Sequence, residues 1–236
     1  HTGCITAISY SPDGHYLATG SEDCSVKIWE ITTGTCMKTL NIGWPITAIS
    51  YDPNSRYIVV GSLDKTINVF DTQSGICIKT LCGFQGHKLQ VSSVTYSPNG
   101  QYILSGSYDG TAKIWKANTG NCLQTLQIAK KNHSMVSVSD AVSSVSFSSD
   151  SRYAILGLCG GAIKIWDLLL NECIKSLDLI ELLLNNATDV VFSFSSNCQY
   201  AVLYHNHLPH YYDDVDLYHA LIDGAPVSMS SILSDS

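Results

Sequence analysis

Short runs of alternating apolar and polar residues recur along the chain, and each run ends at a turn-forming sequence. In the first run, Ile5, Ala7 and Tyr10 alternate with smaller or polar residues before the turn Pro12-Asp13-Gly14. Period-two alternation that ends at a Pro/Gly turn predicts a β-strand followed by a hairpin. The next apolar runs predict three more short strands, over residues 15–21, 25–29 and 36–40.

A ten-residue sequence occurs four times, with an aromatic residue as its third member and a cysteine as its last. The copies are KIWEITTGTC (27–36), NVFDTQSGIC (68–77), KIWKANTGNC (113–122) and KIWDLLLNEC (164–173). Their aromatic residues are 41, 45 and 51 residues apart. A period of roughly 40–50 residues indicates an array of small structural units. The units are residues 1–41, 42–86, 87–137, 138–187 and 188–236, the last of them degenerate.

Four short antiparallel strands cannot bury both faces of the small sheet that they form. Units of this size must therefore stack side by side to make a continuous core. The predicted fold is an all-β array of four-stranded antiparallel blades within a single domain. Two segments lie outside the pattern, residues 128–141 and 178–187. Insertions between repeats often carry partner specificity, although these two are equally compatible with a filler role.

Composition narrows the functional classes. The chain has 13 Lys and Arg against 20 Asp and Glu, and therefore a formal net charge of −7. Nucleic-acid binders normally present a basic face, so we do not expect nucleic acid as the partner. No apolar stretch approaches the ~20 residues of a membrane-spanning helix, and we expect no membrane insertion.

Four of the nine cysteines occupy the same position of the repeat, namely Cys36, Cys77, Cys122 and Cys173. Equivalent positions of successive units lie apart, which makes them poor disulfide partners. We interpret them as small buried hydrophobic residues. An odd cysteine total without paired spacing indicates a reducing compartment. We expect a cytoplasmic protein, with the nucleus as the alternative.

The combination of an SPDG-type turn, a Gly-Ser-x-Asp sequence and a Lys-Ile-Trp strand resembles the WD40 repeat. The resemblance is strong over residues 1–177 and weak over 188–222. It implies a β-propeller. Because rings of this family most often have seven blades, we expect a longer parent chain and a larger ring. A second copy, or the fifth unit itself, is the alternative way to close the ring.

The resemblance also implies a bracing network of His, Ser or Thr, Asp and Trp in each unit. By position, the first and third units supply complete sets: His1, Thr19, Asp23 and Trp29, and His87, Ser105, Asp109 and Trp115. Such a network gives each buried polar atom a partner. A hydrolase interpretation of the same residue types is disfavoured, because the set recurs with the repeat and no G-x-S-x-G motif is present.

The second and fourth units break this network. The second keeps only Asp64, and the fourth keeps only Trp166. Because an orphaned buried polar group is costly, we predict that each finds another partner or that its turn is looser.

In a propeller of this family, the face beside the central channel carries the turns after the second strands and the starts of the first strands. Exposed aromatic residues on such a surface are typical of binding sites. Local packing of Trp44 on its own blade and capping of a turn by Tyr108 are the alternatives. The candidate partner-binding residues are Glu22, Trp44, Pro45, Thr47, Leu63, Gln90, Ser92 and Tyr108.

We therefore expect a non-enzymatic scaffold or adaptor that binds other proteins or peptides and needs no cofactor. A ubiquitin-ligase receptor and a signalling assembly are examples of the complexes that fit. The alternative is an enzyme, or a propeller that binds a small ligand or metal. Its main candidate is the segment 205–210, in which His205, His207 and His210 are plausible zinc or nickel ligands. Because Leu208-Pro209 interrupts any strand there, we favour a loop excursion of the degenerate unit.

Overall fold

The computed structural model describes residues 1–128 and 138–178, together with three further strands within 190–221. The first sheet contains β1 (Ile5–Tyr10), β2 (Tyr16–Ser21), β3 (Ser25–Glu30) and β4 (Cys36–Asn41). The second contains β5 (Ile46–Tyr51), β6 (Tyr57–Ser62), β7 (Ile67–Asp71) and β8 (Cys77–Leu81). The third contains β9 (Val91–Tyr96), β10 (Tyr102–Ser107), β11 (Thr111–Lys116) and β12 (Cys122–Gln127). The fourth contains β13 (Val142–Phe147), β14 (Tyr153–Leu158), β15 (Ala162–Asp167) and β16 (Glu172–Asp178). The fifth contains β17 (Val190–Phe194), β18 (Tyr200–His205) and β19 (Tyr218–Leu221).

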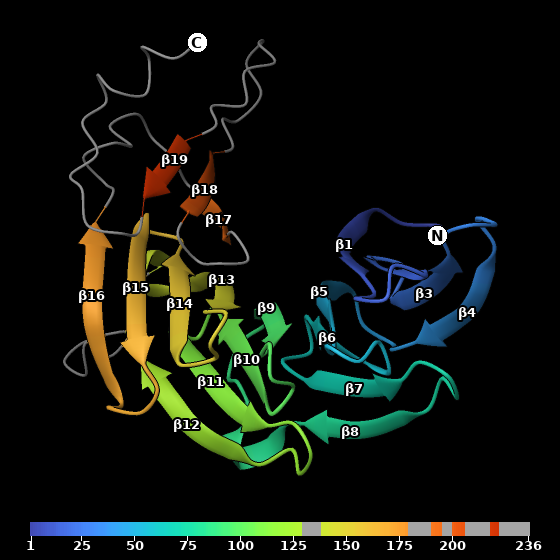
Figure 1. The fold of residues 1–236 in the computed structure, drawn as a ribbon, viewed down its shortest axis with the longest axis horizontal. Helices are drawn as coiled ribbons and strands as arrows, with labels where there is room; N and C mark the ends of the chain where they lie inside the picture. The colour runs from blue at the N-terminus through green and yellow to red at the C-terminus, as the bar shows by residue number, and fades with distance from the viewer. Residues whose placement is uncertain (129–137, 179–189, 195–199, 206–217, 222–236) are drawn as a thin grey trace.

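Each sheet is an antiparallel meander in which strands pair in the order of the sequence. Two short 3₁₀ helices, at Gly83–Gln85 and Val138–Asp140, precede the third and fourth sheets. The sheets follow one another along an arc, with the first strand of each on the inner side and the fourth on the outer side (Figure 1). The all-β prediction and the four-stranded units are confirmed. Within the described residues the fifth sheet has three strands.

The hydrophobic core lies between sheets. Ala18, Val26, Ile28 and Leu40 on one face of the first sheet pack with Ile46, Ile49 and Tyr51 of β5. Two equivalent clusters join the second sheet to the third and the third to the fourth. The second and third sheets therefore each contribute one face to each of two cores, as the predicted stacking requires.

A glycine in the second strand of each of the first three sheets allows the next sheet to approach closely. A Cβ atom on Gly61 would lie 2.8 Å from Val91 Cγ1, and one on Gly106 would lie 2.5 Å from Val142 Cγ1. The same clash would arise between Gly20 and the side chains of Ile46 and Ile49. Real Cβ atoms do not tolerate such distances, so glycine is a packing requirement at these interfaces.

The repeated cysteines are not core residues, and our interpretation of them was wrong. Cys36, Cys77 and Cys173 are exposed, and Cys122 is only partly buried. Each lies opposite the aromatic residue of the neighbouring strand at a register shift, near the start of the outermost strand. There the thiol donates to the carbonyl two residues further on, at 3.3 Å for Cys36 and Lys38. No disulfide joins the cysteines of the described residues, which are free thiols.

We predict that Gly106→Ala lowers the free energy of unfolding by about 1–3 kcal/mol, the usual range for an overpacked core. The added methyl group clashes with Val142 and Val145 on the next sheet. Chemical denaturation of Gly106→Ala, Val142→Ala and the double variant measures the effect. The alanine at 106 is expected to cost less when Val142 is already shortened. An equal cost in both backgrounds would show that the clash is not its cause.

Candidate functional site

Tight turns between the second and third strands are built around an aspartate. Asp23, Asp64 and Asp109 each accept hydrogen bonds from the backbone N–H and the side-chain hydroxyl two residues later. The N–H to Oδ1 distances are 3.0, 2.9 and 3.0 Å, in the same order. These bonds satisfy the local backbone and set the direction of the residue before the aspartate.

In the first and third sheets the aspartate is also held by a histidine. His87 Nδ1 lies 3.1 Å from Asp109 Oδ2, and its Nε2 lies 2.7 Å from Ser105 Oγ. The indole N–H of Trp115 donates to the same Ser105 oxygen at 2.8 Å.

The first sheet repeats this chain of contacts. His1 lies 2.9 Å from Asp23 Oδ2 and 2.7 Å from Thr19 Oγ1, and the Trp29 N–H donates to Thr19 at 2.8 Å. In both sheets the turn is thus tied to the segment that precedes the first strand.

The two sheets that lack the histidine behave differently. Asp64 accepts from the hydroxyl of Ser62 and from both the amide and the hydroxyl of Thr66, so it is not orphaned. By contrast, the buried N–H of Trp166 has no hydrogen-bond partner within the described residues. The fourth sheet therefore has the unsatisfied indole N–H that its incomplete network predicts.

Hydrogen bonds lower the pKa values of two of the turn aspartates. Burial by itself raises the pKa of Asp109, but the hydrogen bond and charge of His87 and the hydrogen bond from Thr111 outweigh it and lower the pKa to about 2. Burial likewise raises the pKa of Asp23, and hydrogen bonds from Ser25 and the Thr2 amide outweigh it, again lowering the pKa to about 2. Both carboxylates are therefore charged at neutral pH, as acceptors for the turn must be.

A second recurring bond joins each turn to the start of the first strand. In each of the first four sheets, the backbone N–H of the residue that begins this turn donates to the backbone carbonyl of the residue just before the first strand. The N···O distances are 3.0–3.2 Å for the three aspartate turns and 2.9 Å for the fourth sheet. The four pairs are Glu22 with Cys4, Leu63 with Pro45, Tyr108 with Gln90, and Cys159 with Ala141.

These paired segments from four sheets line a single cavity of about 510 Å³. Its walls contain seven of the eight candidate residues, with Trp44 as the exception. The turn position of Glu22, Leu63 and Tyr108 predicts Cys159 at the equivalent place in the fourth sheet, and Cys159 lies in the lining. Thr6, Ile46, Val91 and Ser143 also line the cavity and were not among the candidates. The repeat offered a signal for two of these, because Thr6 and Ser143 hold the same strand position as the candidates Thr47 and Ser92. The full lining is Thr6, Glu22, Pro45, Ile46, Thr47, Leu63, Gln90, Val91, Ser92, Tyr108, Ser143 and Cys159.

The hydroxyl groups of this lining differ in their partners. Thr6 Oγ1 donates to the Ile46 carbonyl at 2.6 Å, and Ser92 Oγ donates to the Val142 carbonyl at 2.5 Å, so both link neighbouring sheets. The buried hydroxyl of Thr47 has no partner among the described residues. A ligand that offers a donor or an acceptor at this point would satisfy it.

Among the described residues of the lining, Glu22 alone carries a formal charge, and none is Lys, Arg or His. Tyr108 and Leu63 supply its large apolar surfaces. The cavity is therefore mainly apolar with hydroxyl groups and one carboxylate, a composition suited to binding rather than to proton transfer.

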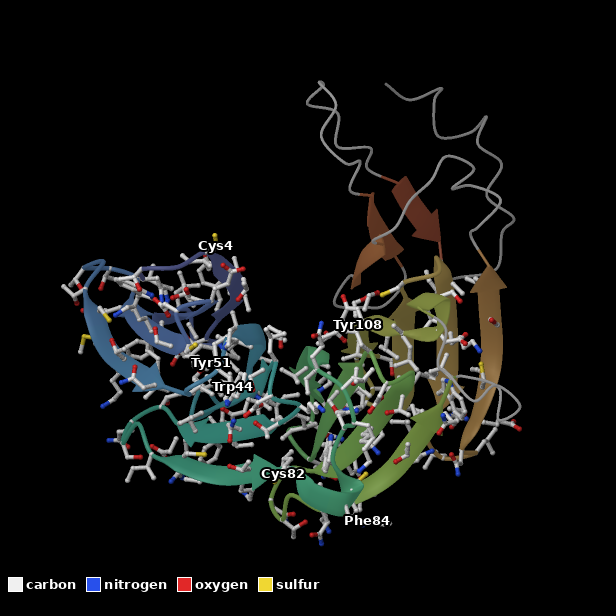
Figure 2. The ribbon with its side chains drawn as sticks, turned by 180° about the vertical axis from the view of Figure 1, so that it is seen from behind. Cys4, Trp44, Tyr51, Cys82, Phe84 and Tyr108 are labelled. Atoms are coloured by element: carbon white, nitrogen blue, oxygen red, sulfur yellow. The ribbon has the colours of Figure 1, made fainter. Side chains whose placement is uncertain are left out.

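Trp44 is exposed, with 55% of its surface accessible, and follows Gly43, whose φ is +88°. Figure 2 shows Trp44 beside the second sheet and Tyr108 on the inner side of the arc, whereas Phe84 lies on the outer side. The structure thus gathers the candidate residues around one cavity except for Trp44, which is not among the lining residues.

The histidine-rich candidate remains untested. His207 and His210 lie outside the described residues, and His205 ends β18. Among the residues that the structure describes, no group of three or more His, Cys, Asp or Glu could hold a metal ion. The described part of the chain also has no helix of the length and apolarity needed to cross a membrane.

Comparison with known proteins supports the repeat assignment. The family model described as "WD domain, G-beta repeat" matches residues 1–30, 34–71, 75–116 and 120–167, more than half of the chain. The Ribosome biogenesis protein bop1 of Danio rerio is 44% identical over 43 residues, which are 18% of this chain and 6% of that protein. The BOP1 homolog of Culex quinquefasciatus is 51% identical over 43 residues, 18% of this chain and 5% of that protein.

The Mus musculus Ribosome biogenesis protein BOP1 is similar to the same extent, at 44% identity over 43 residues. The matched stretch covers 18% of this chain and only 6% of the mouse protein. A stretch of this length corresponds to about one repeat. The likeness is therefore between single repeats.

The indole of Trp115 has a hydrogen-bond acceptor, whereas that of Trp166 has none among the described residues, so we predict unequal effects of replacing each with phenylalanine. Trp115→Phe is expected to cost about 1 kcal/mol more than Trp166→Phe, the typical net value of one hydrogen bond. Urea denaturation of both variants provides the comparison. In a Ser105→Ala background the cost of Trp115→Phe is expected to shrink, and an unchanged cost would assign it to packing alone.

We also predict a loss of stability in acid. Asp23 and Asp109 have pKa values lowered from 3.8 to about 2 in the folded protein, so their contribution is complete above the unfolded value. The free energy of unfolding should fall as the pH drops from about 5 towards 2. Denaturation at a series of pH values measures this slope. Asp109→Asn should flatten the slope over that window, and a parallel pH profile would contradict this assignment.

Proposed function

This chain belongs to the WD40 family, and from that premise we propose that it is a non-enzymatic scaffold that binds a protein or peptide partner at the cavity beside Tyr108. The observation that carries the proposal is the convergence of Glu22, Leu63, Tyr108 and the first-strand residues of four sheets on one cavity. Residues far apart in the sequence are thereby presented on one surface.

Rigidity supports a binding role. Each lining turn is fixed by the aspartate hydrogen bonds and by the bond to the segment before the first strand. Loops that are ordered before binding lose little conformational entropy when a partner arrives. A site made in this way binds with surfaces that are already in position.

The composition of the cavity favours a particular kind of partner. A volume of about 510 Å³ is large enough for one or two side chains of a peptide. Tyr108 and Leu63 are suited to contact apolar or aromatic groups, because buried aromatic contacts dominate many interfaces. The single carboxylate, on Glu22, favours a peptide that carries a basic rather than an acidic side chain at the rim.

A small-ligand propeller is the second candidate. The buried hydroxyl of Thr47 in the cavity, which has no partner among the described residues, favours it. An enzymatic role has less support. The part of the lining that the structure describes contains no histidine to act as a general base for Cys159 or for the hydroxyl groups. We therefore rank peptide binding above small-ligand binding, and both above catalysis.

The assembly in which the scaffold acts is a further part of the proposal. The similar proteins carry the name Ribosome biogenesis protein, which adds a ribosome-assembly complex, and a nuclear location, to the ubiquitin-ligase and signalling complexes considered above. Because that likeness covers one repeat, it supports the assignment of the repeat type more strongly than it supports a role in a ribosome-assembly complex.

Tyr108→Ala is expected to weaken partner binding by ten-fold or more, the range of a hot-spot residue. The measurement is affinity capture with the full chain, followed by titration of each captured protein against purified variants. Glu22→Gln tests the charge preference, and its effect should be larger for partners with a basic segment. Phe84→Ala is the matched control, because Phe84 is an exposed aromatic residue outside the cavity. Equal binding by Tyr108→Ala and the control, with an intact fold, would refute the proposed site.

A further inference from the structure

The turn between β15 and β16 differs in composition from its equivalents in the first three sheets. Residues 168–171 read Leu-Leu-Leu-Asn, and Leu169 and Leu170 are 79% and 60% exposed. The corresponding turns have polar second and third residues and a glycine as the fourth: ITTG (31–34), TQSG (72–75) and ANTG (117–120). The fourth sheet alone among these four thus presents two adjacent leucines to solvent at this turn.

The conformation of the turn does not require these leucines. In the second sheet, Asp71 accepts hydrogen bonds from the backbone N–H of Ser74 at 2.8 Å and from its hydroxyl at 3.0 Å. In the fourth sheet, Asp167 accepts from the backbone N–H groups of Leu169 and Leu170, at 2.8 and 3.2 Å. The backbone therefore closes the turn without any contribution from the leucine side chains. Adjacent exposed apolar side chains with no structural role are typical of a contact surface.

Leu169 lines a cavity of about 410 Å³ between the third and fourth sheets. Leu123 of β12 belongs to the same lining and is exposed as well. Leu168 also lines the cavity, and it packs against the core that joins the two sheets. Leucine side chains from both sheets therefore surround one hollow that can receive an apolar group.

This cavity lies at the opposite ends of the strands from the cavity beside Tyr108. Its lining includes residues from the turns after β13 and β15, the first and third strands of their sheet. Tyr108 lies in the turn after β10, which is the second strand of its sheet. In an antiparallel meander the turns after the first and third strands lie at one edge, and the turn after the second lies at the other. The two cavities are therefore separate surfaces.

The equivalent cavity between the second and third sheets provides an internal comparison. It has a volume of about 300 Å³, and Ala117 and Asn118 line it where Leu168 and Leu169 line the larger one. A hollow at this place is thus a property of the repeat. The leucine lining is particular to the third and fourth sheets.

A contact between side chains holds the apolar turn against the third sheet. The side-chain amide of Gln124 on β12 donates to Oδ1 of Asn171. Asn171 stands where the other turns have glycine, and its φ of +56° is a conformation that asparagine adopts more readily than most residues. Because the two sides of the cavity are linked before a partner arrives, binding there orders few additional groups.

The charge available beside the leucines is negative. Asp150 is exposed and belongs to the lining. Hydrogen bonds from the Ser148 hydroxyl and the Arg152 amide lower the pKa of Asp150, so its carboxylate is charged at neutral pH. The guanidinium of Arg152 is paired with Asp167 instead, at 3.0 and 2.7 Å. Among the described residues, Asp150 takes part in no ion pair, so it remains available to a cation on a partner.

We propose that the cavity lined by Leu123, Leu169 and Asp150 is a second docking site, which binds a segment of a partner protein that carries a large apolar side chain close to a lysine or arginine. The apolar side chain enters the hollow between the sheets and covers the exposed leucines. The basic side chain pairs with Asp150 at the same site. The proposal does not depend on partner binding beside Tyr108.

The probe for a test is a phage-displayed library of random short peptides, selected on the full chain. The selected peptides are synthesised and titrated against purified variants by fluorescence anisotropy. Leu169→Asn combined with Leu170→Thr gives the turn the residues of the third sheet. Ile174→Thr is the matched control, because Ile174 is an exposed aliphatic residue of the same sheet outside the cavity.

We expect a group of peptides that contain a large apolar residue and a lysine or arginine. The double leucine variant should bind them about ten-fold or more weakly, because contacts with buried apolar groups are lost. Asp150→Asn should weaken them by up to about five-fold, the range of an exposed ion pair. Tyr108→Ala and Ile174→Thr should bind them as the parent does. Circular dichroism and the urea midpoint check that each variant is folded, and Leu169→Gln replaces the double variant if that one is not.

Three results would overturn the proposal. The first is that no selected peptide distinguishes the double leucine variant from Ile174→Thr. The second is that the peptides which do so lack basic residues and bind Asp150→Asn as tightly as the parent. The third is self-association of the parent, seen by sedimentation and abolished by the double variant, which would assign the leucines to a second copy of this chain.

Discussion

The structure depends on the close approach of neighbouring sheets. A four-stranded sheet of this size buries little by itself, and its apolar residues become core only when the next sheet covers them. That cover requires the absence of a side chain at Gly20, Gly61 and Gly106, where the following strand inserts its aliphatic groups. The turns, the hydrogen-bonded tryptophans and the cavity all lie on a framework whose spacing these glycines set.

Much of this fold was open to prediction because its information is local. Alternating residues that stop at a turn define the strands, and their repetition defines the sheets. The burial of Cys36 and its equivalents was mispredicted, because exposure depends on which strand is outermost and an apolar residue type does not encode this. Likewise, Asp64 alone did not reveal that Ser62 and Thr66 would replace the missing histidine.

The candidate site, like the fold, could be predicted only in part from the sequence. Repeat position placed seven of the eight candidate residues in the lining of the cavity, because equivalent turns in successive sheets converge on one side of the arc. Trp44 does not belong to the lining, although its neighbour Pro45 does. The unpartnered hydroxyl of Thr47 could not be foreseen, because Thr6 at the equivalent position has a partner on the next sheet.

The replacement of tryptophan by Phe70 in the second sheet has a spectroscopic consequence. The third strands of the first, third and fourth sheets each carry an indole, so the fluorescence of these partly or fully buried groups follows the integrity of three sheets. The second sheet has no such reporter on its third strand. Loosening of that sheet would therefore have little effect on indole fluorescence, because the nearby Trp44 is already exposed to solvent.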